Sequence, residues 1–250
     1  MIPVRRSSFG LIGVGAFGAL AARHLAAHFD LVLHDDIVDT AVLARDTGAR
    51  GGSLSDAAAC DIVMLAVPVQ KIADVARDIA PLLRPGALVV DVGSVKIKPV
   101  AQMLEILPPH IAVVGTHPLF GPQSGKNGIA GLNIAVCEGR GGRAGEVARF
   151  CADALGLRVF EVTPEDHDRQ MGYVQALTHL LAKVVVALDL PDMQLTTRTY
   201  ELMQQMVDMV RYDSDELFRA IERENPFTEQ AKKNFFAAAR ALEDRLASGG

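Results

Sequence analysis

A histidine directly before a proline stands in the chemically most suggestive stretch of this chain. The stretch reads Gly115-Thr-His-Pro-Leu-Phe-Gly-Pro-Gln-Ser-Gly-Lys-Asn-Gly128, and it follows an apolar run, 110–114, that is typical of a buried strand. Turn-forming residues fill most positions after Pro118. Because loops at strand ends commonly present reactive groups, we expect His117 to lie in such a loop and to exchange a proton with a ligand.

A second stretch with recognisable chemistry lies near the N-terminus. There an apolar run, 9–12, leads into Gly13-Val-Gly-Ala-Phe-Gly18. Three glycines in this pattern, after a strand and before a helix, are typical of a dinucleotide-binding turn. Gly13 permits the tight turn, Gly15 lets a pyrophosphate approach the backbone, and Gly18 lets the helix pack on the strand. The helix N-terminus then offers N–H donors to the phosphates.

The ends of two further apolar runs extend this candidate site. Asp35 ends one run and can accept both ribose hydroxyls, whereas it would repel a 2′-phosphate. Since no arginine follows it, we expect NAD rather than NADP. The run 61–68 ends in a proline turn, which should face the dinucleotide in the same way. The predicted cofactor-binding residues are Gly13, Gly15, Ala16, Phe17, Gly18, Asp35, Val67 and Pro68.

Ser94 follows another apolar run, within Asp91-Val-Gly-Ser-Val-Lys96. This position predicts that its hydroxyl lies near the nicotinamide side of the crevice. Ser94 could equally serve as the N-cap of the helix that follows, and the two roles are compatible.

The elements that must position these residues alternate between strand and helix as far as residue 162. Near-continuous apolar strands separated by helices favour a Rossmann-type, doubly wound and mostly parallel sheet. The expected strands are 9–12, 31–33, 62–66, 88–92, 111–114, 133–136 and 158–162. The expected helices between them are 17–28, 70–83, 98–107 and 143–155.

After residue 162 the pattern becomes helical throughout. Thr163-Pro-Glu-Asp166 is typical of a helix start, with proline at the first helical position. The expected helices are 165–188, 195–211, 214–224 and 227–246. The first of these is too apolar to lie alone on a surface. We therefore expect an NAD-binding domain over residues 1–162 and an all-helical substrate and dimerisation domain over residues 163–250, in a homodimer.

Composition excludes several classes of partner. The chain has 250 residues, of which 50% are hydrophobic, and a formal charge of −5 without a lysine- or arginine-rich run. We therefore expect no nucleic-acid partner, no membrane span and no secretory signal. The three cysteines lack metal-binding spacing, so we expect reduced thiols in a cytoplasmic protein and no metal site.

Taken together, these motifs resemble the prephenate/arogenate dehydrogenase family of tyrosine biosynthesis. The resemblance rests on Gly115–Pro122, on Asp91–Lys96 before it and on Glu165–His179 after it. It extends from Phe9 to about Asn225 and implies a Rossmann domain followed by a helical dimerisation domain. It also implies that His117 is the catalytic histidine and that Ser94 supports it. The substrate-binding residues expected on this basis are Ser94, His117, Gln123, Ser124, Lys126, Gln175 and His179.

The implied chemistry suits these residue types. In prephenate, hydride leaves C4 for NAD while CO2 leaves C1, and the ring becomes aromatic. A neutral imidazole at His117 that accepts the hydroxyl proton would accelerate the reaction by typically ~10²–10⁴-fold. Turnover should accordingly fall at acidic pH, where the imidazole is protonated.

Two positions depart from the pattern of the family. Many relatives carry Gly-Arg for a substrate carboxylate where this chain has Asp208-Met209. Gln123 stands where several relatives have an acid, which modestly favours prephenate over arogenate, whose ammonium would require a carboxylate. Basic residues that could replace the arginine are Lys126, Arg198 and Arg211, or residues of a partner subunit. Acids that could bind an ammonium are Asp166, Asp168 and Asp208.

Two alternatives to this assignment remain open. A hydroxyacid or imine oxidoreductase of the same plan would use a lysine of the helical domain, for which Lys183 is the candidate. A non-catalytic NAD(H) sensor would need the glycine turn and Asp35, but not Ser94, His117 and His179 together.

Overall fold

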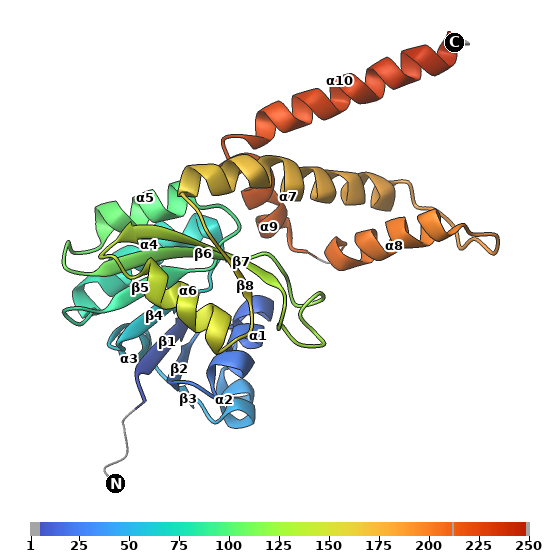
Figure 1. Cartoon of the computed structure of the whole chain (residues 1–250). Helices are drawn as coiled ribbons and strands as arrows, with labels where there is room; N and C mark the ends of the chain where they lie inside the picture. The colour runs from blue at the N-terminus through green and yellow to red at the C-terminus, as the bar shows by residue number, and fades with distance from the viewer. Residues whose placement is uncertain (1–5, 212, 249–250) are drawn as a thin grey trace. The chain divides into compact units, whose positions relative to one another are not determined.

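The computed structural model describes residues 6–211 and 213–248. The chain folds into two compact units, Met1–Pro164 and Glu165–Gly250 (Figure 1). The first unit contains the sheet with its covering helices, and the second is helical.

The first unit is built on an eight-stranded sheet in the order β3-β2-β1-β4-β5-β6-β7-β8. All neighbouring strands are parallel except β6 and β7, which are antiparallel. The strands are β1 (Ser8–Ile12), β2 (Asp30–His34), β3 (Arg50–Gly51), β4 (Ile62–Leu65), β5 (Leu88–Asp91), β6 (Ala112–Pro118), β7 (Asn133–Arg140) and β8 (Arg158–Glu161). The predicted Rossmann-type sheet is confirmed, and its order reverses between β1 and β4, where such folds bind ligands.

Helices cover both faces of this sheet (Figure 1). They are α1 (Ala16–Leu25), α2 (Ala41–Thr47), α3 (Leu54–Ala58), α4 (Ile72–Ile79), α5 (Ile97–Ile106) and α6 (Ala144–Asp153), with 3-10 turns η1 (Val69–Lys71) and η2 (Ala80–Leu82). Helix α4 shows why they pack there. Its Ile72, Ala76 and Ile79 recur at helical spacing and are fully buried in the core.

Several elements differ from the sequence-based expectation. Strand β6 continues through Pro118, and β7 continues to Arg140, because these two strands pair antiparallel over this length. The short elements α2, β3 and α3 were not predicted, since each has seven or fewer residues and gives little periodicity. The three cysteines are free and buried, as expected for core thiols.

The second unit consists of α7 (Pro164–Ala187), α8 (Arg198–Val210), α9 (Asp215–Arg219), a π-helix η3 (Ala220–Glu224) and α10 (Thr228–Ala247). Pro164 is the first residue of α7, as predicted. Side chains cap two of the other helices, where Thr197 accepts from the N–H of Tyr200 and Ser214 from that of Leu217. Within the described residues, we find no helix whose length and apolar content would let it cross a bilayer.

Candidate active site

The candidate residues of the first unit follow one row across the sheet. His34, Ile12, Leu65, Asp91 and Gly115 are register partners on β2, β1, β4, β5 and β6. Because these strands are parallel, their carboxyl ends open at one edge. The candidate residues that follow the row at this edge are Asp35, Gly13, Val67, Ser94 and His117.

The glycine turn leaves room for a ligand at the start of α1. Gly13 has a φ of +95°, which favours glycine, and its N–H donates to the carbonyl of His34. A Cβ on Gly18 would lie 2.0 Å from the carbonyl oxygen of Gly13, so only glycine lets the helix sit this close. At Gly15, the N-cap of α1, a Cβ would meet no atom within 4 Å. This open helix N-terminus fits the pyrophosphate of a dinucleotide.

Asp35 fixes the same turn from the neighbouring strand. Its Oδ2 accepts from the N–H of Val14 at 2.8 Å, and its Oδ1 accepts from Ile37 and Val38 at 2.8 Å each. Partial burial acts to raise the pKa of Asp35, but these backbone hydrogen bonds outweigh it and hold the pKa below its usual value. Asp35 is therefore a carboxylate at neutral pH, which suits ribose hydroxyls and opposes a 2′-phosphate.

Two contacts link the glycine turn to its neighbours. A Cβ on Gly13 would lie 3.0 Å from Cγ1 of Val67, and the following Pro68 is the N-cap of η1. On the other side, the rings of Phe17 in α1 and Phe120 after β6 lie 6.3 Å apart between centroids. The structure thus brings the loop after β6 against the helix that begins the cofactor turn.

His117 lies within a strand rather than in a loop, and our expectation on this point is wrong. It is part of β6, opposite Ala135 of β7, and is 5% exposed. The turn-forming residues begin only after the ladder ends at Pro118, which, as the last residue of β6, interrupts little. The imidazole is therefore positioned by a sheet, which is a more rigid support than a loop.

The loop after β6 carries the other predicted substrate contacts of this unit. Ser124 closes a turn on Gly121, accepting from its N–H at 3.0 Å and donating to its carbonyl at 3.2 Å. Gln123, Ser124 and Lys126 are all exposed. A role for these three side chains in substrate binding stays a prediction.

Ser94 is buried but its hydroxyl is not used by the fold. It is 5% exposed, and among the residues the structure describes its Oγ has no hydrogen-bond partner. Its suggested role as an N-cap is wrong, because α5 begins at Ile97 with Lys96 as the N-cap residue. A buried hydroxyl without a partner costs about 1–3 kcal/mol, which a ligand hydrogen bond would recover.

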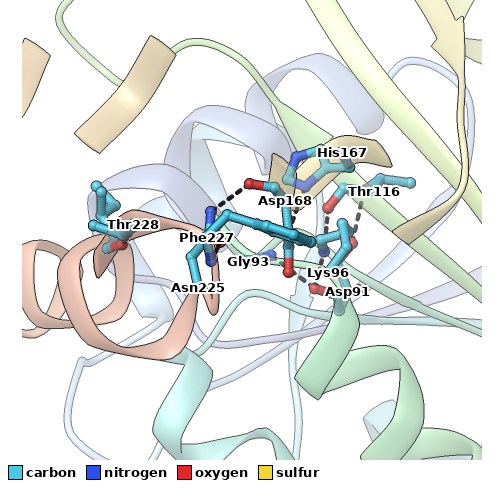
Figure 2. Close-up of polar contacts among 10 residues, drawn as sticks. Asp91, Gly93, Lys96, Thr116, His167, Asp168, Asn225, Phe227 and Thr228 are labelled. Carbon is cyan, nitrogen blue, oxygen red and sulfur yellow. Dashed lines mark hydrogen bonds and ion pairs between the residues drawn. The ribbon is translucent and has the colours of Figure 1, made fainter. Parts of the chain in front are cut away.

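A buried lysine, which sequence reasoning missed, links the end of β5, which precedes Ser94, to β6, which carries His117. Lys96 donates to the carboxylate of Asp91 and, at 2.6 Å, to the carbonyl of Thr116 (Figure 2). Thr116 in turn donates to the carbonyl of Asp91 at 2.7 Å. Lys96 and Asp91 are both fully buried. The signal available in the sequence was a lysine five residues after the aspartate that ends an apolar run.

In the second unit, Gln175 and His179 lie one turn apart on α7. The Nδ1 of His179 is 2.9 Å from the carbonyl of Gln175, and its Nε2 is 3.0 Å from Oδ2 of Asp213. His179 is 7% exposed. Both ring nitrogens thus face oxygens of this unit, and substrate binding by these two residues stays a prediction.

The basic residues nominated in the second unit are engaged in helix-surface pairs. Arg211 pairs with Asp208 and Arg198 with Glu201, each at 3.3 Å. Lys183, the rival acid/base, lies 5.4 Å from the ring centroid of Phe218, a packing contact.

Among the nominated acids, Asp168 is fully buried. Its carboxylate is 2.7 Å from Nδ1 of His167, and its carbonyl accepts from Asn225 (Figure 2). It is therefore held by contacts inside its own unit.

A cavity of about 510 Å³ in the first unit lies beside this row of residues, and Phe17, Thr116 and Pro118 are among the residues that line it. It lies between α1 and α6 over the sheet and is lined mostly by apolar side chains, such as Leu20, Val90 and Phe150. Neither Asp35 nor His117 borders it. Its size alone therefore does not make it the site of the chemistry.

Comparison with known proteins agrees with the geometry. Residues 19–132 match the nucleotide-binding domain of prephenate dehydrogenase. The chain is 30% identical over 237 residues to arogenate dehydrogenase 2, chloroplastic, of Arabidopsis thaliana, a match that covers 89% of this chain and 66% of the relative. It is 31% identical over 174 residues to 4-amino-4-deoxyprephenate dehydrogenase of Streptomyces pristinaespiralis, covering 67% of this chain and 57% of the relative. The chain thus spans less than two thirds of the length of each.

A solved structure shares the fold over almost the whole chain. The crystal structure of prephenate dehydrogenase from A. aeolicus, in complex with hydroxyphenyl propionate and NAD+, superposes with a TM-score of 0.77. The two sequences are 21% identical, and the match covers 98% of this chain and 92% of the other. At this identity the likeness bears on the fold alone.

Proposed function

Because this chain belongs to the prephenate and arogenate dehydrogenase family, we propose that it catalyses the NAD-dependent oxidative decarboxylation of a cyclohexadienyl substrate. The observation that carries this proposal is the shared register of β1, β5 and β6. That register aligns the glycine turn, Ser94 and His117 at one edge of the sheet. A dinucleotide held at the turn would have its reactive end directed along this edge.

NAD, when bound, accepts the hydride that leaves C4 of the substrate. The open N-terminus of α1 would bind the pyrophosphate, and Asp35 would bind the ribose hydroxyls. Two observations support binding of NAD at this position: a Cβ on Gly15 would meet no atom within 4 Å, and Asp35 is charged. Because a carboxylate repels a 2′-phosphate, we propose NAD rather than NADP.

His117 accepts the proton of the C4 hydroxyl at an imidazole nitrogen as that carbon gains carbonyl character. Its position on β6 fixes the ring, so little reorganisation is needed during the reaction. Ser94 donates its otherwise unused hydroxyl to the reacting oxygen or to the imidazole. Loss of CO2 makes the ring aromatic and supplies much of the driving force, so the main task of the protein is alignment.

For the side chain of the substrate, the sequence supports prephenate as the first candidate. Gln123, at the position where several relatives have an acid, is neutral and exposed. Arogenate is the second candidate, and it is supported by a buried carboxylate in the second unit, Glu222. Gln175 and His179 are the proposed substrate contacts of that unit.

The proposal is tested by following NADH absorbance with purified protein. Prephenate and arogenate are each offered with NAD and with NADP. We expect NADH to form with at least one substrate and the activity with NADP to be much lower. Calorimetric binding of NAD without turnover of either substrate would contradict the proposal and favour the sensor. Activity that survives His117→Asn but is lost in Lys183→Met would favour the rival oxidoreductase.

A further inference from the structure

Glu222 is a buried carboxylate that has a long ion-pair contact with Lys232 but accepts no short hydrogen bond within the described residues. The side chain belongs to the π-helix η3 and is only 7% exposed. Neither Oε1 nor Oε2 has a hydrogen-bond partner within residues 6–211 and 213–248. Burying an ionised carboxylate without donors is among the costlier arrangements in a protein.

The charges around Glu222 compensate it only in part. The Nζ of Lys232 lies 3.8 Å from Oε2 of Glu222, which is too long for a hydrogen bond. Lys232 donates instead to the backbone carbonyl of Glu222 at 3.0 Å and also pairs with Glu229 at 3.5 Å. Burial raises the pKa of Glu222, while the charges of Lys232 and His179 act in the opposite direction. The carboxylate thus lies within electrostatic reach of His179.

The backbone holds Glu222 in this buried position. Residues Ala220–Glu224 form a π-helix, a rare conformation that is frequent at functional sites. The hydroxyl of Thr228, which is fully buried, donates to the carbonyl of Ile221 at 3.0 Å. Ala220 and Ile221 are buried as well. The packed turn therefore holds the backbone of Glu222 in place.

Beside the long contact with Lys232, such a carboxylate has room in its hydrogen bonding for a cation that donates to its oxygens. The two candidate substrates differ at one group, which is an ammonium in arogenate and a keto oxygen in prephenate. An ammonium offers three donors and a positive charge, whereas a keto oxygen would face the lone pairs of the carboxylate. The carboxylate of Glu222 therefore favours arogenate, which carries the ammonium, over prephenate.

We propose that Glu222 is the specificity-determining residue of this chain and that it binds the ammonium group of arogenate. This inference rests on the proposed function, and it favours arogenate, the second candidate named there, over prephenate, the candidate that Gln123 favours. Glu222 is a binding residue, and it takes no part in hydride or proton transfer.

The test compares Glu222→Gln with Glu229→Gln in the full chain. Both substitutions remove one negative charge beside Lys232, but Glu229 is exposed. For Glu222→Gln, we expect kcat/KM for arogenate to fall at least ~10-fold, as for other lost charged hydrogen bonds, and kcat/KM for prephenate to stay or rise. Glu229→Gln should change neither by more than ~2-fold. An equal fall for both substrates in Glu222→Gln, or a wild type that does not use arogenate, would overturn the inference.

A second variant and a binding measurement separate recognition from folding. Glu222→Asp keeps the charge and should keep the preference for arogenate at a reduced rate, so loss of that preference would overturn the inference. Calorimetry of L-tyrosine and 4-hydroxyphenylpyruvate, the two products, should show weakened tyrosine binding alone in Glu222→Gln. Failure of the proposed function is distinct, because the wild type would then form no NADH with either substrate.

Discussion

Ser94 offers a residue-scale test in which stability and activity separate. Its buried hydroxyl has no hydrogen-bond partner in the described chain, so removing it costs the fold nothing. We expect Ser94→Ala to keep or slightly raise the melting temperature, while kcat falls about 10-fold through loss of one hydrogen bond at the reacting centre. Thermal unfolding and steady-state kinetics on the same preparation measure both effects. A fall in melting temperature with unchanged kcat would instead assign the hydroxyl to the fold.

Residue types at strand ends were predictable because they follow from general chemistry. Glycine at the turn, an acid after the next strand and a histidine before proline each have a recognisable function. The roles of Lys96 and Glu222 were not predicted. Lys96 is notable because it is buried and closely paired, and Glu222 because it is buried without a short hydrogen bond in the described residues. Burial of a charged residue at one position depends on contacts between distant segments, which sequence periodicity does not reveal.

At the scale of elements, the turn between β1 and α1 allows two glycines to be tested against each other. In Gly18→Ala, the new Cβ would lie 2.0 Å from the carbonyl oxygen of Gly13, so the helix must move. We expect a loss of about 1–3 kcal/mol in stability together with weaker NAD binding. In Gly15→Ala, the Cβ meets no protein atom within 4 Å, so stability should be kept while NAD binding weakens.

Differential scanning calorimetry with and without NAD checks this pair. A first-unit transition that is equally stable in Gly18→Ala and wild type would show that α1 does not require the close approach. NAD binding that is unchanged in Gly15→Ala would show that the pyrophosphate does not lie at the start of the helix.

Most strands could be predicted from apolar runs, but the pairing of β6 with β7 could not. The expected strand stopped at Val114, since the residues after it resemble a turn, whereas pairing with β7 extends β6 through Pro118. Tertiary pairing therefore prevailed over local propensity. For α3, a capping box between Ser53 and Asp56 was present in the sequence and would have indicated its start.

At the scale of the whole molecule, an apolar stripe on α7 supports the proposed homodimer. Val174, Leu181 and Val184 of α7, with Leu188 directly after its end, recur at helical spacing and are 40–63% exposed in the single chain. Exposed apolar stripes of this kind usually mark an interface. We propose that the helical unit dimerises through this surface, and we expect Leu181→Glu to shift the protein from dimer to monomer in analytical ultracentrifugation.

The control for this experiment is Lys71→Glu, a charge change at an exposed position of the first unit. It should leave the sedimentation of the wild type unchanged. A wild type that sediments as a monomer at micromolar concentration, or a Leu181→Glu variant that stays dimeric, would contradict an interface on α7.

In the sequence, strand patterns stop near residue 162, and in the structure the first compact unit ends at Pro164. The packing of the helices in the second unit could not be predicted from the sequence. Some of their apolar residues lie in a core and others lie in an exposed stripe, and the pattern does not distinguish the two. The π-helix also escaped prediction, since the pattern over 214–224 indicates one regular helix.

The most direct test of the whole account is the rate of NADH formation by His117→Asn under saturating substrate and NAD. His110→Asn is the matched control, because His110 is exposed and precedes the amino end of β6, at the opposite edge of the sheet. We predict that kcat falls ~10²–10⁴-fold in His117→Asn while NAD binding is retained, and that His110→Asn keeps wild-type turnover. A His117→Asn variant with the turnover of the wild type would contradict the role of this imidazole.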